Sequence, residues 1–172
     1  IRNNPLTKIM KTQQELLDFF IPKLDKSFAK YRKKSLVKAR QAQVGQEVIT
    51  HTSDGIETKN TASEGDWLIE NQTSVKEQYL IKSETFQKKY TLRNSMGDGW
   101  GCYQPKGNVL GIEVDDKLLL SLGAQNQLEF EAPWKESMVV KSGDFLIIPE
   151  DLNEIYRIAK KEFGETYELV KA

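Results

Sequence analysis

A short pattern of residues occurs twice in this chain, and this repetition constrains the fold more than any other feature of the sequence. Gly65-Asp66-Trp67-Leu68-Ile69 returns near the other end as Gly143-Asp144-Phe145-Leu146-Ile147. An aromatic trio follows each copy in the same order: Tyr79, Phe86 and Tyr90 after the first, Tyr156, Phe163 and Tyr167 after the second. The spacing within the two copies differs by a single residue. We therefore expect one small structural unit to be present twice.

The composition is that of a globular protein, and it excludes several functional classes. A chain of 172 residues with 38% hydrophobic and 29% charged residues suits one domain or two small ones. The 25 basic residues balance the 25 acidic ones, so no overall charge favours nucleic acid or an anionic membrane. Cys102 and His51 are the only residues of their types, which excludes a zinc site built from those ligands alone.

The same features bear on location. A single cysteine favours a reducing compartment, and we expect the cytoplasm. The longest apolar runs are too short to span a bilayer, and the start of the chain carries no signal-peptide pattern. Because the chain begins with Ile1, we expect a fragment or a processed form, and a targeting segment upstream stays open.

Residues 1–34 are expected to form a helical segment. Thr12-Gln13-Gln14-Glu15 has the spacing of a capping box, and apolar residues follow it at helical intervals. Pro22 has no amide proton, so it must kink this helix or begin a second one. A helix that packs on the core is favoured over one that binds a partner. A basic run could contact phosphate, but a solvated helix end is the favoured interpretation: Lys30, Arg32, Lys33 and Lys34.

The remaining chain divides into two similar strand-rich units, residues 35–93 and 112–172, joined by a glycine-rich connector at 94–111. In the first unit, Ser53-Asp54-Gly55 predicts the turn of a β-hairpin, and Ser83 is placed to cap a short helix. The second unit repeats this plan. The fold class is therefore α+β, with two small antiparallel units that each carry a short helix, preceded by the helical segment.

The order of these elements resembles a known family. An alternating strand, a hairpin, a Gly-Asp-aromatic-aliphatic-Ile strand, a tyrosine-bearing strand and a Phe-x-x-x-Tyr helix are together similar to the small PGDYG-type domain of phage and bacterial proteins. The likeness covers about half of the chain, as two diverged copies. Glu64 and Ser142 stand where the motif has proline, while Glu70 and Ile148 stand near its final glycine. Such domains have no established activity, so the resemblance implies a fold and transfers no catalytic residues.

The glycine-rich stretch from Trp100 to Gly107 contains the best candidates for ligand binding. Trp100 and Tyr103 could stack on a flat ring, and Lys106 could hold an anion. No phosphate-loop or dinucleotide motif is present, so no cofactor is predicted. A plain linker between the units is the favoured alternative. Cys102 could act as a nucleophile only if folding brought His51 beside it.

Asp66 and Asp144 follow a glycine in each copy and could bind a ligand or act as bases. We favour a structural role, in which each accepts amide hydrogen bonds within its own turn. The aromatic trios are assigned to the core, with tyrosine hydroxyls reaching a polar rim. Asp115 and Asp116 lack calcium-loop spacing and are expected to cap a helix, so no metal site is predicted.

These observations favour a non-enzymatic binding protein that recognises a small molecule or a protein partner. Two alternatives stay open. One is an enzyme acting on a nucleotide or another phosphorylated metabolite, with Lys106 holding the anion and Asp66 or Asp144 as acid or base. The other is a phage or bacterial effector that inhibits a host protein through the N-terminal helix.

Overall fold

The computed structural model describes residues 10–170, which form a mixed structure that is mostly antiparallel β. The chain opens with helix α1 (Gln13–Phe20), the single 3₁₀ turn η1 (Ile21–Lys23) and helix α2 (Leu24–Ser27). The capping box is confirmed, since the Thr12 side chain accepts the Glu15 amide and the Glu15 side chain accepts the Thr12 amide. Pro22 lies at the start of η1, where its missing amide proton costs no hydrogen bond.

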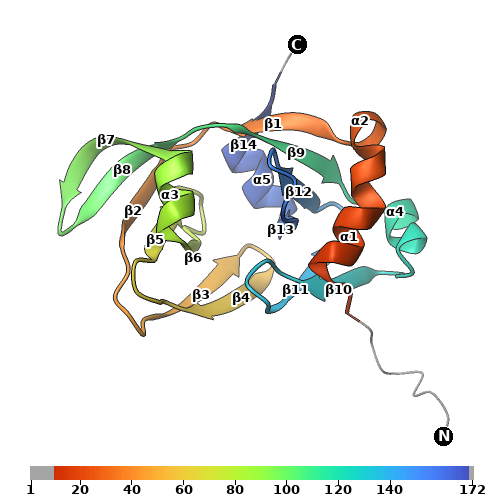
Figure 1. Cartoon of the computed structure of the whole chain (residues 1–172), viewed down its shortest axis with the longest axis horizontal. Coiled ribbons are helices and arrows are strands. Elements are labelled where there is room, and N and C mark those ends of the chain that lie inside the picture. Colours follow the sequence, from red (N-terminus) through yellow and green to blue (C-terminus); the bar gives the residue numbers. More distant parts are fainter. Residues whose placement is uncertain (1–9, 171–172) are drawn as a thin grey trace, which may run out of the picture.

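Ten strands form two separate five-stranded sheets, which lie side by side in Figure 1. The first sheet has the order β6-β5-β2-β8-β7, with bounds Gln78–Ile81, Trp67–Asn71, Val37–Gln41, Trp100–Pro105 and Tyr90–Gly97. The second has the order β13-β12-β9-β1-β14, with bounds Tyr156–Ile158, Phe145–Pro149, Asn108–Glu113, Ala29–Lys33 and Tyr167–Leu169. Within both sheets every neighbouring pair is antiparallel.

One hairpin and a short helix before the last strand complete each half. Helix α3 (Ser83–Lys89) precedes β7, and helix α5 (Lys160–Thr166) precedes β14. The hairpin β3 (Glu47–Thr52) and β4 (Gly55–Thr61) belongs to the first half, and β10 (Gln127–Glu131) with β11 (Ser137–Lys141) to the second. Both hairpins lie along the lower side of the molecule in Figure 1. Helix α4 (Asp116–Ser121) leads into β10 and is capped by Asp115, whose Oδ1 accepts the Leu118 amide.

The N-terminal segment is part of the second half. Strand β1 lies between β9 and β14, and helix α1 inserts Leu16, Leu17 and Phe20 into the larger of two apolar clusters. That cluster also contains buried residues of α4, β10, β11 and β12. The smaller cluster has Val37, Ala39, Ile69 and Phe86 at its centre, in the first half. A packing helix was the favoured interpretation, and the burial of α1 agrees with it.

Three local expectations differ from the structure. Residues 30–33 belong to strand β1 and not to a helix end, because this backbone pairs with β9 and β14 on its two sides. The stretch 94–111, expected as an irregular connector, forms the end of β7, all of β8 and most of β9. Gly97, Gly99 and Gly107 have positive φ angles at or beside the turns, whereas Gly101 and Gly111 lie within strands. Ser83 is the first residue of α3; the N-cap is Lys82, which has no capping side-chain hydrogen bond.

Burial of α1 predicts a large stability difference between two leucines. Leu16 is fully buried, whereas Leu120 on α4 is 64% exposed. We expect Leu16→Ala to lower the free energy of unfolding by about 2–5 kcal/mol, because it leaves a cavity in the core. Leu120→Ala should change it by about 0.5 kcal/mol or less. Urea denaturation followed by circular dichroism measures both, and equal losses would contradict the packing of α1.

Candidate functional site

The structure separates the three residues proposed from sequence to bind a ligand. Trp100 and Tyr103 lie on opposite faces of β8, as residues three apart on a strand must. Tyr103 faces the helix side, with its ring 4.8 Å from Phe86. Trp100 lies on the other face, under the charged ends of Lys38 and Arg40 at 5.0 and 5.3 Å from its ring centre. Trp100 and Tyr103 therefore cannot hold one flat ligand between them.

Lys106 lies in the turn that joins β8 to β9, at the edge of a shallow depression of about 450 Å³. Its other lining residues come mainly from β1, β8 and the chain just after each: Arg32, Lys33, Lys34, Gln104, Pro105, Gly107, Asn108 and Glu168. Arg32 is neutralised by Glu168 at 2.7 Å, in a pair that is largely exposed. The depression is thus a solvated basic surface, not a closed anion site.

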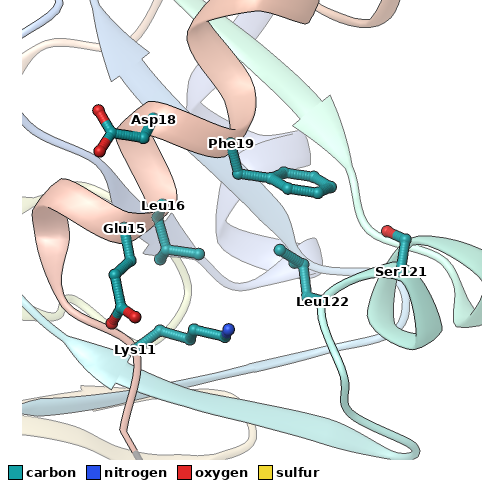
Figure 2. A pocket seen from close by; sticks show the side chains of 7 residues that line it. All are labelled: Lys11, Glu15, Leu16, Asp18, Phe19, Ser121 and Leu122. Carbon is teal, nitrogen blue, oxygen red and sulfur yellow. The ribbon is translucent and has the colours of Figure 1, made fainter.

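A second depression, of about 420 Å³, lies between α1 and the end of α4 (Figure 2). Leu16, Phe19 and Leu122 form its apolar part, with Lys11 and Glu15 nearby. Glu15 is already engaged, because its carboxylate accepts the Thr12 amide of the capping box. The depression combines a wide mouth with apolar residues that belong to the core, so it presents little that could orient a ligand.

Asp66 and Asp144 make the same contact in their respective turns. Asp66 Oδ2 accepts the Ser63 amide at 2.8 Å, and Asp144 Oδ2 accepts the Lys141 amide at 2.9 Å. Both side chains are buried, with 4% relative exposure. The preceding glycines have φ angles of +84° and +97°, a backbone conformation that favours glycine, which explains the Gly-Asp pairing.

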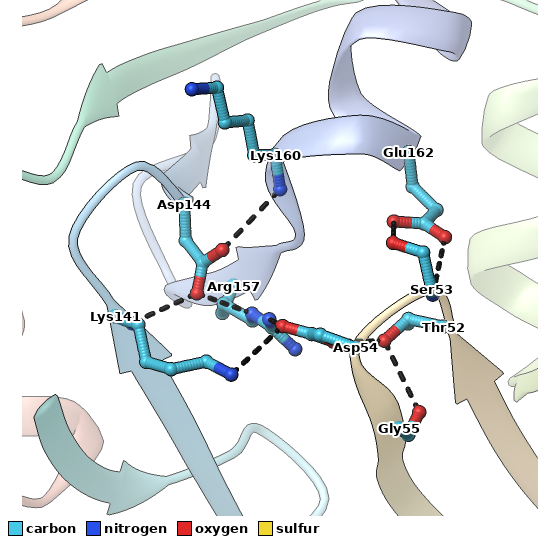
Figure 3. Close-up of polar contacts among 9 residues, drawn as sticks. All are labelled: Thr52, Ser53, Asp54, Gly55, Lys141, Asp144, Arg157, Lys160 and Glu162. Atoms are coloured by element: carbon cyan, nitrogen blue, oxygen red, sulfur yellow. Dashed lines mark hydrogen bonds and ion pairs between the residues drawn. The ribbon is translucent and has the colours of Figure 1, made fainter.

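Asp144 has further partners that Asp66 lacks. The buried Arg157 donates from Nε to Asp144 at 2.9 Å and from an Nη to Asp54 at 2.5 Å (Figure 3). Asp54 comes from the β3–β4 turn of the first half and also pairs with Lys141 at 3.1 Å. Beside it, the Ser53 amide donates to the buried Glu162 of α5 at 2.8 Å. This ion-pair network joins the first hairpin to the second half of the molecule.

The network fixes the charge of Asp54. Burial alone raises the pKa of this carboxyl, but the Thr52 hydroxyl bond and the charges of Arg157 and Lys141 outweigh it and lower the pKa to about 2. The carboxylate therefore stays ionised at any physiological pH. Its position supports a structural use, since every strong partner of Asp54 is a neighbouring side chain.

The aromatic residues of the two halves form closely similar stacks. Phe86 stacks on Trp67 at 4.0 Å and on Tyr90 at 5.2 Å. In the other half, Phe163 stacks on Phe145 at 3.8 Å and on Tyr167 at 5.0 Å. A further tyrosine meets each stack edge-on: Tyr103 in the first half and Tyr31, from β1, in the second.

A glycine lies beneath each of these edge-on tyrosines. A Cβ on Gly101 would lie 2.8 Å from the Tyr103 ring, and one on Gly111 would lie 3.2 Å from the Tyr31 ring. These glycines leave room for the rings. The aromatic residues are thus used for packing, as their spacing in the sequence predicted.

The polar ends of four other tyrosines and one lysine gather between the two halves. We call this group, Lys33, Tyr79, Tyr90, Tyr156 and Tyr167, the tyrosine–lysine cluster; each member is half-buried. The Tyr79 and Tyr90 hydroxyls are 3.2 Å apart, and the Tyr156 and Tyr167 hydroxyls lie close enough to influence each other's pKa. Lys33 connects the pairs, because it donates to the Tyr79 hydroxyl at 3.1 Å and its Cα lies opposite that of Tyr167 across β1 and β14.

Burial favours the uncharged forms of the lysine and the tyrosines in this cluster. Burial lowers the pKa of Lys33 to about 8, although the nearby Glu77 carboxylate opposes this shift. Burial also raises the pKa of all four tyrosines, and neighbouring tyrosines of the cluster raise those of Tyr79, Tyr156 and Tyr167 further. The hydroxyls therefore stay protonated and remain hydrogen-bond donors at physiological pH.

Two polar side chains hold Lys33 on its first-half side. Asn71 Oδ1 accepts from the Lys33 ammonium at 2.7 Å, while the Asn71 amide donates to Glu77 at 3.1 Å. Glu77 also accepts a short hydrogen bond from the Thr73 hydroxyl. Asn71 thus bridges the lysine and the carboxylate, and each oxygen of Glu77 accepts a hydrogen bond from a nearby residue of the first half.

Sequence reasoning found part of this cluster. It placed the tyrosine rings in the core with their hydroxyls at a polar rim, and it read Lys33 as one member of a solvated basic run. No signal in the sequence distinguishes Lys33 from Lys30 or Lys34. Its role depends on the pairing of β1 with β14, which brings together residues from opposite ends of the chain.

Comparisons with known proteins do not assign this chain to a family. No protein-family model, curated protein or solved structure matches this chain. Within residues 10–170, no helix is long and apolar enough to cross a membrane. The described part of the chain also contains no group of three or more His, Cys, Asp or Glu side chains that could hold a metal ion.

The ion-pair network predicts a strong effect of removing Arg157. Arg157→Met should lower the free energy of unfolding by about 3–5 kcal/mol, because it leaves the buried Asp144 carboxylate without its cation. Arg32→Met is the matched control, since its pair with Glu168 is exposed, and should cost about 1 kcal/mol or less. Chemical denaturation measures both, and a small loss for Arg157→Met would show that the network is not stabilising.

The tyrosine–lysine cluster predicts an unusual alkaline stability profile. Because folded Lys33 has a pKa of about 8 against the ordinary 10.5, the unfolded chain binds more protons between these values. Stability should therefore rise with pH above about 8. Above the ordinary tyrosine pKa of 10.0, the raised pKa values of the folded tyrosines reverse the trend. Urea denaturation from pH 7 to pH 11 should show a maximum at about pH 9–10.

Lys33→Met provides the control for this profile. The variant should lack the rise above pH 8 and keep the fall caused by the tyrosines. Glu77, Glu154 and Lys89 also face the cluster, and salt screens their charges. The two denaturation series are therefore compared at constant ionic strength. A rise that persists unchanged in Lys33→Met would assign it to another group.

Proposed function

We propose that this chain is a non-enzymatic binding protein made of two related PGDYG-like units, which recognises a small molecule or a protein partner between them. One observation carries the proposal. The matched tyrosines of the two units bring their hydroxyls together with Lys33 in one half-buried cluster. Packing alone would place the aromatic rings there, but it does not require five polar side-chain ends to meet.

The relatedness of the units is supported by their topology. Aligning the two Gly-Asp strands matches β5 with β12, and the neighbours then follow in order: β6 with β13, β2 with β9, β8 with β1, and β7 with β14. The stacked aromatic residues match in the same alignment. We infer a duplication in which the strand equivalent to β8 is supplied to the second unit by the N-terminal segment.

The two alternative functions gain no support from specific contacts. Both aspartates proposed as acid or base accept amide hydrogen bonds in their own turns, and Asp144 is also paired with Arg157. The apolar face of α1, which a host-protein inhibitor would present, is buried in the core of the second half. We therefore favour binding, and place the protein in a reducing compartment such as the cytoplasm on account of its single cysteine.

A ligand screen tests this proposal. Thermal shift of the purified chain against neutral and charged metabolites should reveal a ligand that raises Tm, since a ligand at about 100 times its Kd adds roughly 2.7 kcal/mol. The shift should be lost in the double variant Tyr90→Phe, Tyr167→Phe, which removes two hydroxyls and keeps both rings. Tyr103→Phe is the matched control, because that ring lies in an aromatic stack outside the cluster.

A pull-down with the same variants tests whether the chain binds a protein partner through the cluster. A ligand or partner that binds the double variant as well as the unchanged chain would contradict the proposed location. Turnover of a bound metabolite would contradict the non-enzymatic assignment.

A further inference from the structure

The tyrosine–lysine cluster contains more hydrogen-bond donors than its described contacts use. Each tyrosine hydroxyl carries one proton, and a pair of hydroxyls uses at most one of its two protons internally. The pairs Tyr79–Tyr90 and Tyr156–Tyr167 therefore leave at least one proton each. The Lys33 ammonium carries three protons, of which the Asn71 and Tyr79 oxygens accept two. Three donors thus lack an acceptor among the described contacts.

The nearby carboxylates do not supply the missing acceptors. Glu77 accepts one hydrogen bond at each oxygen, from Asn71 and from Thr73. Glu154 lies near Tyr156, and burial raises its pKa while Lys89 opposes the shift. No hydrogen bond from a tyrosine hydroxyl or from Lys33 to either carboxylate is found among the described contacts. The cluster therefore presents donors, with one ammonium charge among them.

We propose that this cluster binds an oxyanion, the carboxylate or phosphate group of a small molecule, through Lys33 and one hydroxyl of each tyrosine pair. An oxyanion accepts several hydrogen bonds at once and needs no proton of its own, which matches three donors without acceptors. The charge of Lys33 strengthens each bond in this half-buried place. This inference names the ligand chemistry of the proposed binding function, and it rests on that function.

The geometry also indicates how the ligand would act on the protein. Lys33 belongs to β1, Tyr79 and Tyr90 to the first half, and Tyr156 and Tyr167 to the second. An oxyanion held by all three groups would bridge the two halves, and its binding energy would add to the free energy of unfolding. Acetate and phosphate should therefore both raise Tm, and the size of the shift distinguishes the two chemistries.

Titration calorimetry and thermal shift with sodium acetate and sodium phosphate test the inference, against sodium chloride at equal ionic strength. Loss of a hydrogen bond to a charged group should weaken binding about tenfold or more. We expect this for Lys33→Met, for Tyr90→Phe and for Tyr167→Phe. Lys30→Met is the matched control, because Lys30 is exposed on the opposite face of β1 and lines neither depression, and it should leave binding unchanged.

Acetate provides a second, independent measurement that does not need a variant. Its charge is constant above about pH 6, so its affinity should fall as Lys33 loses its proton above about pH 8. The groups that face Lys33 are Glu77 and the tyrosines, with Glu154 and Lys89 beyond them. Of these, the tyrosines hold their protons until higher pH, so a fall near pH 8 would belong to Lys33.

Several outcomes would overturn the inference. Binding that survives in Lys33→Met, or that is lost in Lys30→Met, would place the anion elsewhere. Equal Tm in acetate, phosphate and chloride would show that the cluster binds no oxyanion. If a neutral metabolite then binds and needs the two hydroxyls, the proposed binding function stands and only its oxyanion chemistry fails. If no metabolite or partner binds at all, the binding function itself fails.

Discussion

The pairing of β1 with both β9 and β14 is the constraint on which the rest of the structure depends. Through it, the N-terminal segment becomes the fourth strand of a sheet whose other members all come after residue 107. The same strand carries Tyr31 into the aromatic stack of Phe163 and Lys33 into the tyrosine–lysine cluster. Helix α1, just before it in the chain, closes the larger core. One short strand thus determines the core, the stack and the candidate site of the second half.

Local features of the fold could be predicted from the sequence because short-range physics decides them. The capping box at Thr12 and the Asp115 cap each depend on residues a few positions apart, and each has the expected geometry. The hairpin expected at Ser53-Asp54-Gly55 also forms, although its two turn residues are Ser53 and Asp54 and only Gly55, the first residue of β4, has a positive φ. Strand β1 could not be found in this way. Its residues follow an amphipathic helix and include three cations in five positions, which resembles a solvated helix end, and pairing with distant strands selects the extended conformation.

The candidate site shows the same division. The tyrosines could be predicted from their spacing, since they occupy matched positions in the two halves: Tyr79 and Tyr156 on β6 and β13, and Tyr90 and Tyr167 at the starts of β7 and β14. The position of Lys33 among them depends on long-range register, which no local pattern encodes. Trp100, Tyr103 and Lys106 were adjacent in sequence and suggested a single site, but the alternation of a strand sends the two rings to opposite faces. Sequence proximity predicts a site only where the backbone conformation is known.

The position of β1 also has a consequence for synthesis on the ribosome. The strands of the first sheet lie within residues 37–105, so that half can form as soon as these residues leave the exit tunnel. Strand β1 is made before all of them, yet its partners β9 and β14 emerge later, one near the end of the described chain. Until then Tyr31 and the apolar face of α1 have no native partners and are exposed to the cell. Helix α1 and β1 would therefore stay open to chaperones and proteases until β14 has been made.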